Sequence, residues 1–286
     1  MSRLILIIFA FASFIFAQPS HASFRHACSE HTFEGQLLKY CIDYGSPNNH
    51  DLLYIFTGSN GTEQDWVKAI DNVRIQQAWD TEGIRSPTKI TISFGDEWDF
   101  NDTDTAANPS LQRLFVTQII PYIESEIPGP HGRRLFKGVS MGGWNGVQLL
   151  LKNSELFDKM ALICPVISMV TPFSPQADID AFIAKNQPYI NLEWFNDLLE
   201  DERKMFATVA DWNRHDPLVL VHTAQFKTKS IYLSCAKEDQ YGFFEGSELF
   251  AKLAQGHGAP VTWQPTTGGH CVIDAKVVAH FFTDLD

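Results

Sequence analysis

The chain has 286 residues, and its 22 Lys and Arg residues against 34 Asp and Glu residues give a formal net charge of −12. No cluster of basic residues interrupts this acidic balance, so we expect neither nucleic acid nor an anionic membrane surface among the partners of the protein.

The first residues have the features of a secretory signal peptide. Arg3 precedes an apolar run from Leu4 to Ala17, and Ser20-His21-Ala22 is a small-x-small cleavage site. A membrane-spanning helix needs about 20 apolar residues, so a retained anchor is the weaker interpretation of this shorter run. We predict a signal peptide over 1–22, an exported protein that is periplasmic or secreted, and no stable membrane anchor after processing.

The mature part, 23–286, has a length that one α/β core can reach, and no linker divides it. Short apolar runs alternate with helix-like segments, which predicts a single α/β domain with a mostly parallel central sheet covered by helices on both faces. The first expected strand alternates in hydropathy and can be antiparallel at an edge. The expected strands are 37–44, 52–56, 89–94, 135–137, 160–164, 230–233 and 261–264, and the expected helices are 111–123, 147–151, 243–253 and 277–282.

The stretch from Pro165 to Thr228 is too long for a bare connection between two strands. Its segments 179–183 and 192–209 have helical periodicity. We therefore predict a helical lid inserted over 166–228.

Five cysteines follow the signal peptide. Cys28 and Cys41 flank a polar stretch between two strand-like segments, and a hairpin there would join them in a disulfide. Cys164 and Cys235 end apolar strands, so a buried free thiol is as good an interpretation of each as a disulfide. A bond between Cys271 and Cys235 is a weaker alternative. No CxxC or HxxxH spacing indicates a metal, and no cofactor is expected.

The most specific motif is Gly138-Val139-Ser140-Met141-Gly142, a GxSxG pentapeptide between the strand 134–137 and the helical run 143–152. Strand, sharp turn and helix form the nucleophile elbow of the α/β-hydrolase fold, in which the serine hydroxyl is exposed. The glycines are needed because a side chain at either position would collide with the closely approaching strand and helix. Ser140 is the predicted nucleophile, and a purely structural turn is the alternative.

A serine hydroxyl needs a base, and in this fold the order along the chain is nucleophile, acid, histidine. His270 follows a strand and two glycines in Thr267-Gly268-Gly269-His270 and is the predicted base. His257 lies at a helix stop, and His280 lies within a helical pattern. Both are weaker candidates for the base.

The catalytic acid is expected at the end of the preceding strand. Asp239 lies 31 residues before His270, which leaves room for one helix and one strand. Glu238 is its rival, whereas Asp216 is interpreted as a turn or helix-cap residue.

Two backbone N–H groups are expected to form an oxyanion hole. One belongs to Met141, directly after the nucleophile. The other is assigned to Ser59 in the glycine-rich turn Thr57-Gly58-Ser59-Asn60-Gly61. Several aromatic residues near these loops could line a pocket, although each is more often a core residue: Trp98, Trp144, Trp194, Phe195, Trp212 and Tyr241.

These features resemble the putative esterase family, which includes esterase D, feruloyl esterases, enterochelin esterases and the antigen 85 mycolyltransferases. The resemblance covers 52–61, 118–124, the elbow, 237–243 and Gly268-Gly269-His270. It implies an α/β-hydrolase fold and a cofactor-free acyl-serine mechanism, with the triad Ser140, Asp239 and His270. The chain departs from the family in two places: Thr57-Gly58 stands where His-Gly is usual, and the lid is longer.

The leading functional hypothesis is hydrolysis of a small-molecule or glycan-linked carboxylic ester. An acyltransferase would use the same triad to pass the acyl group to a sugar or lipid hydroxyl. A non-catalytic binding protein of the same fold is the third possibility.

Overall fold

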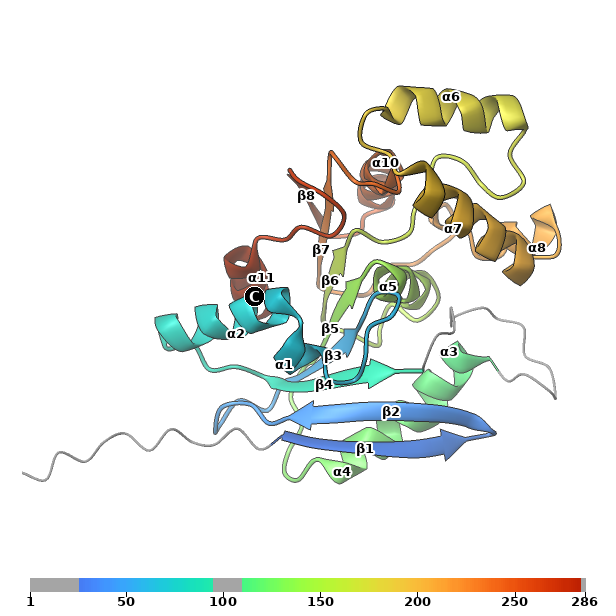
Figure 1. Ribbon diagram of the computed structural model, residues 1–286. Coiled ribbons are helices and arrows are strands. Elements are labelled where there is room, and N and C mark those ends of the chain that lie inside the picture. Colours follow the sequence, from blue (N-terminus) through green and yellow to red (C-terminus); the bar gives the residue numbers. More distant parts are fainter. Residues whose placement is uncertain (1–25, 95–109, 284–286) are drawn as a thin grey trace, which may run out of the picture.

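The computed structural model describes residues 26–94 and 110–283 (Figure 1). Its centre is an eight-stranded sheet in the order β1-β2-β4-β3-β5-β6-β7-β8. From β4 to β8 in this order, each adjacent pair of strands is parallel, whereas β2 is antiparallel to both β1 and β4. Their bounds are β1 His26–Phe33, β2 Gln36–Asp43, β3 Leu52–Phe56, β4 Thr88–Ser93, β5 Arg134–Val139, β6 Lys159–Ile163, β7 Ser230–Ala236 and β8 Val261–Thr266.

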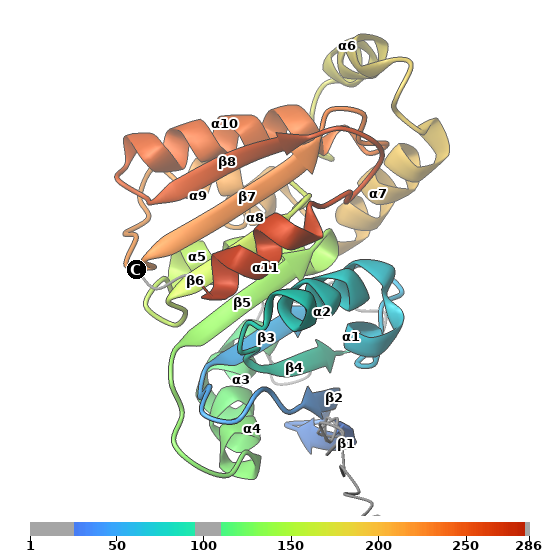
Figure 2. The same cartoon turned by 90° about the vertical axis from the view of Figure 1, so that its left-hand side faces the viewer.

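Helices cover both faces of the sheet, and the predicted fold class is confirmed. Figure 2 shows α2 (Ile70–Glu82) and α11 (Ala275–Thr283) in front of the strands and α5 (Met141–Lys152) behind them. The second face also carries α3 (Leu111–Leu114), a π-helical turn (Phe115–Ile119), α4 (Ile120–Glu126) and α10 (Phe243–Gly256). A short helix, α1 (Asp65–Lys68), precedes α2.

The strand β3 is apolar throughout because it faces a core on each side. In β3, Leu53 and Ile55 pack with residues of α2 and α11, whereas Tyr54 and Phe56 pack on the opposite side with residues of α5. Trp79 of α2 also donates its indole N–H to the carbonyl of Ala279 in α11, at 2.9 Å. The strands are thus fixed from both faces, and their carboxyl ends provide a rigid edge for the site.

The segment predicted as a lid contains α6 (Gln176–Asn186), α7 (Leu192–Met205), α8 (Val209–Asn213) and α9 (Pro217–Leu220). In Figure 1, α6 and α7 lie beyond the carboxyl ends of the parallel strands. The expected helix 192–209 is two helices, because the side chain of Thr208 accepts the N–H of Asp211 and starts α8. Asp216 caps α9 by accepting the N–H of Leu218, as expected.

The cysteine predictions are partly correct. Cys28 and Cys41 form a disulfide and are opposite each other in the β1–β2 pair. The alternative bond between Cys271 and Cys235 is wrong, because Cys271 is bonded to Cys164, which directly follows β6. Cys235 is a buried free thiol, one of the interpretations left open for it.

The predicted signal peptide, 1–22, and Trp98 lie outside the described residues. Within the described ranges, no helix combines the length and the apolar character needed to span a bilayer.

Candidate active site

Ser140 occupies a sharp turn between β5 and α5. Its backbone has φ 55° and ψ −114°, a conformation that few non-glycine residues adopt, and its N–H donates to the carbonyl of Ile163 at 3.0 Å. A Cβ atom on Gly138 would collide with the carbonyl of Gly142, and one on Gly142 would collide with the carbonyl of Phe56. The glycines of the motif are therefore required by the close approach of β3, β5 and α5, as the sequence indicates.

The side chains of Ser140, His270 and Asp239 form one hydrogen-bonded chain. Nε2 of His270 lies 2.9 Å from Oγ of Ser140, and Nδ1 lies 2.7 Å from Oδ2 of Asp239. A carboxylate only accepts hydrogen bonds, so Nδ1 carries the proton and Nε2 is left to accept from the serine hydroxyl. The structure thus brings together three residues that are up to 130 positions apart in the sequence.

The carboxylate of Asp239 is buried and fully bound. Its side chain has no exposed area, and Oδ1 accepts the N–H of Tyr241 at 2.9 Å and that of Phe243 at 3.4 Å. The thiol of Cys235 lies 3.7 Å from Oδ2. Burial raises the pKa of this thiol well above its usual value, so it keeps its proton and donates towards the carboxylate.

The rival residues lie elsewhere. His280 pairs with Glu82 at 2.6 Å, and His257 ends α10. Glu238, the alternative acid, accepts the N–H of Gly268 at 2.7 Å and does not contact the imidazole of His270. Of the alternatives considered, only Asp239 and His270 are in line with Ser140.

The predicted oxyanion donors lie on either side of the serine. Met141 is the first residue of α5, and Ser59 belongs to a turn closed by the N–H of Gly61 donating to Gly58. This turn is close to the nucleophile, because a Cβ atom on Gly58 would lie 3.3 Å from Cβ of Ser140. Among the described residues, neither Met141 N–H nor Ser59 N–H has a hydrogen-bond acceptor.

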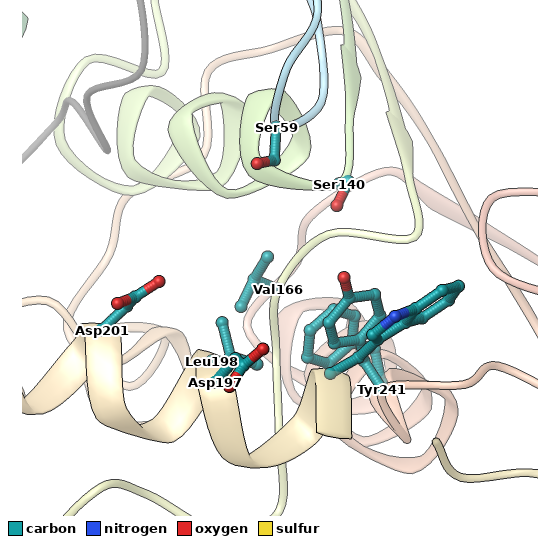
Figure 3. Close-up of a pocket in the computed structure, with 9 residues that line it drawn as sticks. Ser59, Ser140, Val166, Asp197, Leu198, Asp201 and Tyr241 are labelled. Atoms are coloured by element: carbon teal, nitrogen blue, oxygen red, sulfur yellow. The ribbon is translucent and has the colours of Figure 1, made fainter. Parts of the chain in front are cut away.

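A pocket of about 120 Å³ lies between the two serines, Ser140 and Ser59, and α7, which forms its opposite wall (Figure 3). Trp194 stacks on Tyr241 with ring centroids 5.5 Å apart, and the rings of Tyr241 and His270 meet at an interplanar angle of 60°. One and two turns further along α7, the carboxylates of Asp197 and Asp201 also line the pocket. The apolar part of the wall comes from Val166, Leu198 and Phe243.

A family comparison agrees with this geometry. Residues 42–264 match the model of the family described as Putative esterase. The chain belongs to this esterase family. Together with the serine-centred hydrogen-bonded chain, the family makes the protein a serine hydrolase of the carboxylic ester type.

Solved structures with low sequence identity share the fold of this esterase. The fluorophosphonate-binding serine hydrolase F of Staphylococcus aureus has a TM-score of 0.64 at 12% identity, covering 92% of this chain and 99% of that one. An S-formylglutathione hydrolase from Agrobacterium tumefaciens has a TM-score of 0.62 at 15% identity, covering 92% and 95%. A ferulic acid esterase has a TM-score of 0.58 at 16% identity, covering 91% and 95%. No curated protein sequence matches the esterase.

The aromatic predictions divide between pocket and core. Trp194 and Tyr241 line the pocket of the esterase, whereas Trp144, Phe195 and Trp212 are buried in core clusters. Asp197 and Asp201 were missed by sequence reasoning. Their four-residue spacing places them on one side of a helix, but the sequence does not reveal that this side faces Ser140.

Two groups of His and Cys side chains lie close enough to hold an ion among the described residues. One contains His26, Cys28 and Cys41, and the other contains Cys164, His270 and Cys271. In both groups the cysteine sulfurs are joined in a disulfide, so neither group offers a thiolate ligand to a metal.

Proposed function

We propose that the protein is an exported serine esterase that cleaves a carboxylic ester through an acyl-serine intermediate. The observation that carries this proposal is the chain of hydrogen bonds from Ser140 through His270 to Asp239, next to a pocket that both Ser140 and Ser59 line.

In the first half of the reaction, Nε2 of His270 takes the hydroxyl proton as Oγ of Ser140 attacks the ester carbonyl. Asp239 stabilises the imidazolium that forms and holds its orientation. The negative charge on the carbonyl oxygen is placed near the N–H groups of Met141 and Ser59. When the tetrahedral intermediate collapses, His270 returns the proton to the leaving alcohol, and the acyl group stays on Ser140.

In the second half, a water molecule takes the position of the departed alcohol. His270 removes its proton, the resulting hydroxyl attacks the acyl carbonyl, and a second tetrahedral intermediate forms at the same N–H groups. Its collapse releases the carboxylic acid, and His270 returns the proton to Oγ of Ser140, which restores the hydroxyl.

The pocket supports a small-molecule or glycan-linked ester that is uncharged next to the reacting carbonyl. Trp194, which is 44% exposed, offers a flat apolar surface, and Asp197 and Asp201 accept hydrogen bonds but repel anions. Glutathione carries carboxylates, so the substrate named for the Agrobacterium tumefaciens structure suits this wall less well than an uncharged ester such as that of a ferulic acid esterase.

The features of the N-terminal segment and the two disulfides support export to the periplasm or the medium, because disulfides persist in oxidising compartments. The proposal includes no stable membrane anchor after processing and no nucleic-acid partner. The latter accords with the net charge of −12.

The first test is the turnover of p-nitrophenyl acetate and butyrate by the mature protein, next to a Ser140→Ala variant of equal folded content. The proposal requires turnover that disappears in the variant and labelling of Ser140 by a fluorophosphonate. Equal rates in the two proteins, or no labelling of folded wild-type protein, would contradict it. Added alcohols separate hydrolysis from acyl transfer, since a transferase diverts the product from free acid to a new ester.

A further inference from the structure

The disulfide between Cys164 and Cys271 joins the catalytic loop to the sheet at the residue next to the base. Cys271 directly follows His270, and Cys164 directly follows the last residue of β6. In the sheet, β6 lies between β5, which leads to Ser140, and β7, which leads to Asp239. The bond therefore fixes His270 to the strand between its two partners.

The cystine is anchored firmly at one end only. Cys164 is fully buried, and its N–H donates to the carbonyl of Ser234 at 2.7 Å. Residues 267–274, the loop between β8 and α11, include no fully buried side chain, and Val272 is 43% exposed. Cys271 and Ile273 pack only partly buried against the core cluster on this face, so apolar burial holds this loop less firmly than it holds Cys164.

Hydrogen bonds add only partly exposed links. The N–H of Gly268 donates to Glu238 at 2.7 Å, and the N–H of His270 donates to the side chain of Gln240. Both acceptors belong to the acid loop, and water competes with such bonds at a surface. Apart from the backbone itself, the cystine links the loop covalently to the end of β6.

We propose that the Cys164–Cys271 disulfide is a positioning element for His270, and that the esterase is fully active only when this bond is formed. The inference rests on the proposed function. A displacement of about 1 Å in a catalytic group can cost about a hundredfold in rate, and the two hydrogen bonds of His270 leave little tolerance for such a displacement. Formation of the bond in an oxidising compartment then completes the active site.

Reduction is chemically simple. A dithiol such as dithiothreitol attacks Cys271, which is only half-buried, and the S–S bond breaks. The sulfurs of Cys164 and Cys271 take up two electrons and two protons and become thiols, while dithiothreitol becomes its cyclic disulfide. Reoxidation by oxidised glutathione reverses the change.

The test compares three proteins: the oxidised wild type, a Cys164→Ala/Cys271→Ala variant, and a Cys28→Ser/Cys41→Ser variant that lacks only the hairpin disulfide. We expect kcat for p-nitrophenyl acetate to fall by about a hundredfold in the first variant, with KM within about twofold of the wild-type value. The hairpin variant keeps the wild-type kcat. Reduced and alkylated wild-type protein behaves as the first variant, and reoxidation without alkylation restores the activity.

Each alternative outcome is informative. An oxidised wild type that neither turns over the ester nor reacts with a fluorophosphonate contradicts the proposed function itself. Active wild type together with a folded, equally active Cys164→Ala/Cys271→Ala variant overturns the disulfide proposal alone. Loss of the native far-UV circular dichroism in both that variant and the reduced wild type overturns it as well, because the proposal confines the role of the bond to the His270 loop.

Discussion

Asp239 is held by Tyr241, whose N–H donates to Oδ1 of the carboxylate at 2.9 Å and leaves Oδ2 facing His270. This division of the two oxygens decides what an amide would do at the same position. In Asp239→Asn, the amide oxygen stays on the N–H of Tyr241, and the amide NH₂ points at Nδ1 of His270. The imidazole must then accept at Nδ1 and carry its proton on Nε2, where it can no longer take the proton of Ser140.

We therefore expect Asp239→Asn to lower kcat by about 10⁴-fold while the protein stays folded. Steady-state kinetics with p-nitrophenyl acetate measure the effect. Glu238→Gln is the matched control on the neighbouring acid, and its kcat should fall by less than about tenfold. A larger loss of kcat in the Glu238 variant than in the Asp239 variant would make Glu238 the catalytic acid and contradict the assignment of Asp239.

A buried acid in α7 makes the stability depend on pH. Burial is the main cause that raises the pKa of Glu202 from 4.5 to about 8, and the negative charge of Asp216 is the second cause. Between these two values the native state holds a proton that the unfolded state has released, so the stability from this group is complete below about pH 4.5 and is lost as the pH rises through about 8. Glu202→Gln keeps the neutral form at every pH.

The Gln variant should therefore be more stable than the wild type at pH 8, on the order of a few kcal/mol, and the difference should shrink towards pH 5. Urea unfolding at both pH values gives the comparison, and groups shared by the two proteins cancel. A constant difference between wild type and variant across this range would rule out Glu202 as the source.

The carboxylates on α7 should select against anionic substrates. Asp197 and Asp201 line the pocket opposite Ser140, and Asp201 also pairs with Lys204 at 3.0 Å. In an Asp197→Asn/Asp201→Asn variant, kcat/KM for the mono-p-nitrophenyl ester of succinic acid should rise about fivefold, since a charge pair in water is worth about 1 kcal/mol at 4 Å. The value for p-nitrophenyl acetate should change little.

Two controls accompany this comparison. Glu193→Gln removes one charge from the same helix outside the pocket and should leave the ratio of the two esters unchanged. Added salt should reduce the advantage of the Asn variant by screening. A uniform change for both esters would show that the substitutions alter the lid and not its charge selectivity.

The strained conformation of Ser140 predicts that glycine is more stable than alanine at this position. Its φ of 55° costs a serine or alanine about 1–3 kcal/mol but suits glycine. After the entropic cost of glycine, Ser140→Gly should exceed Ser140→Ala in unfolding free energy by about 1 kcal/mol, and both variants should be inactive. Chemical denaturation of the two inactive variants decides the point, and equal midpoints would mean that the turn is not strained.

The sequence predicts most of the sheet because its signals are local. Strands such as β3 and β6 are buried on both faces and stand out as continuous apolar runs. The helix α2 was missed because only Asn72, Ile75 and Trp79 among its 13 residues are buried, which leaves a weak helical pattern. The strand 37–44 is antiparallel as expected, but β1 and not β2 occupies the edge of the sheet.

The candidate site also divides into features that the sequence predicts and features that only the structure reveals. Ser140, Asp239 and His270 each follow a strand, and strand ends meet at one edge of a parallel sheet, so their proximity could be inferred without coordinates. The bond between Cys164 and Cys271 could not, because it requires the strand order that places β6 between β5 and β7. The position of Asp197 and Asp201 on the pocket wall depends on the direction in which α7 crosses the pocket. The helical period of the sequence does not specify that direction.

The lid contains a small apolar cluster of its own. It contains Val170, Ile179, Phe182, Ile190, Phe195 and Leu199, none of which belongs to the two clusters that flank the sheet. Substitutions confined to this cluster therefore leave the packing of the strands that hold the triad unchanged, whereas Leu198 of α7 packs in a cluster that flanks the sheet.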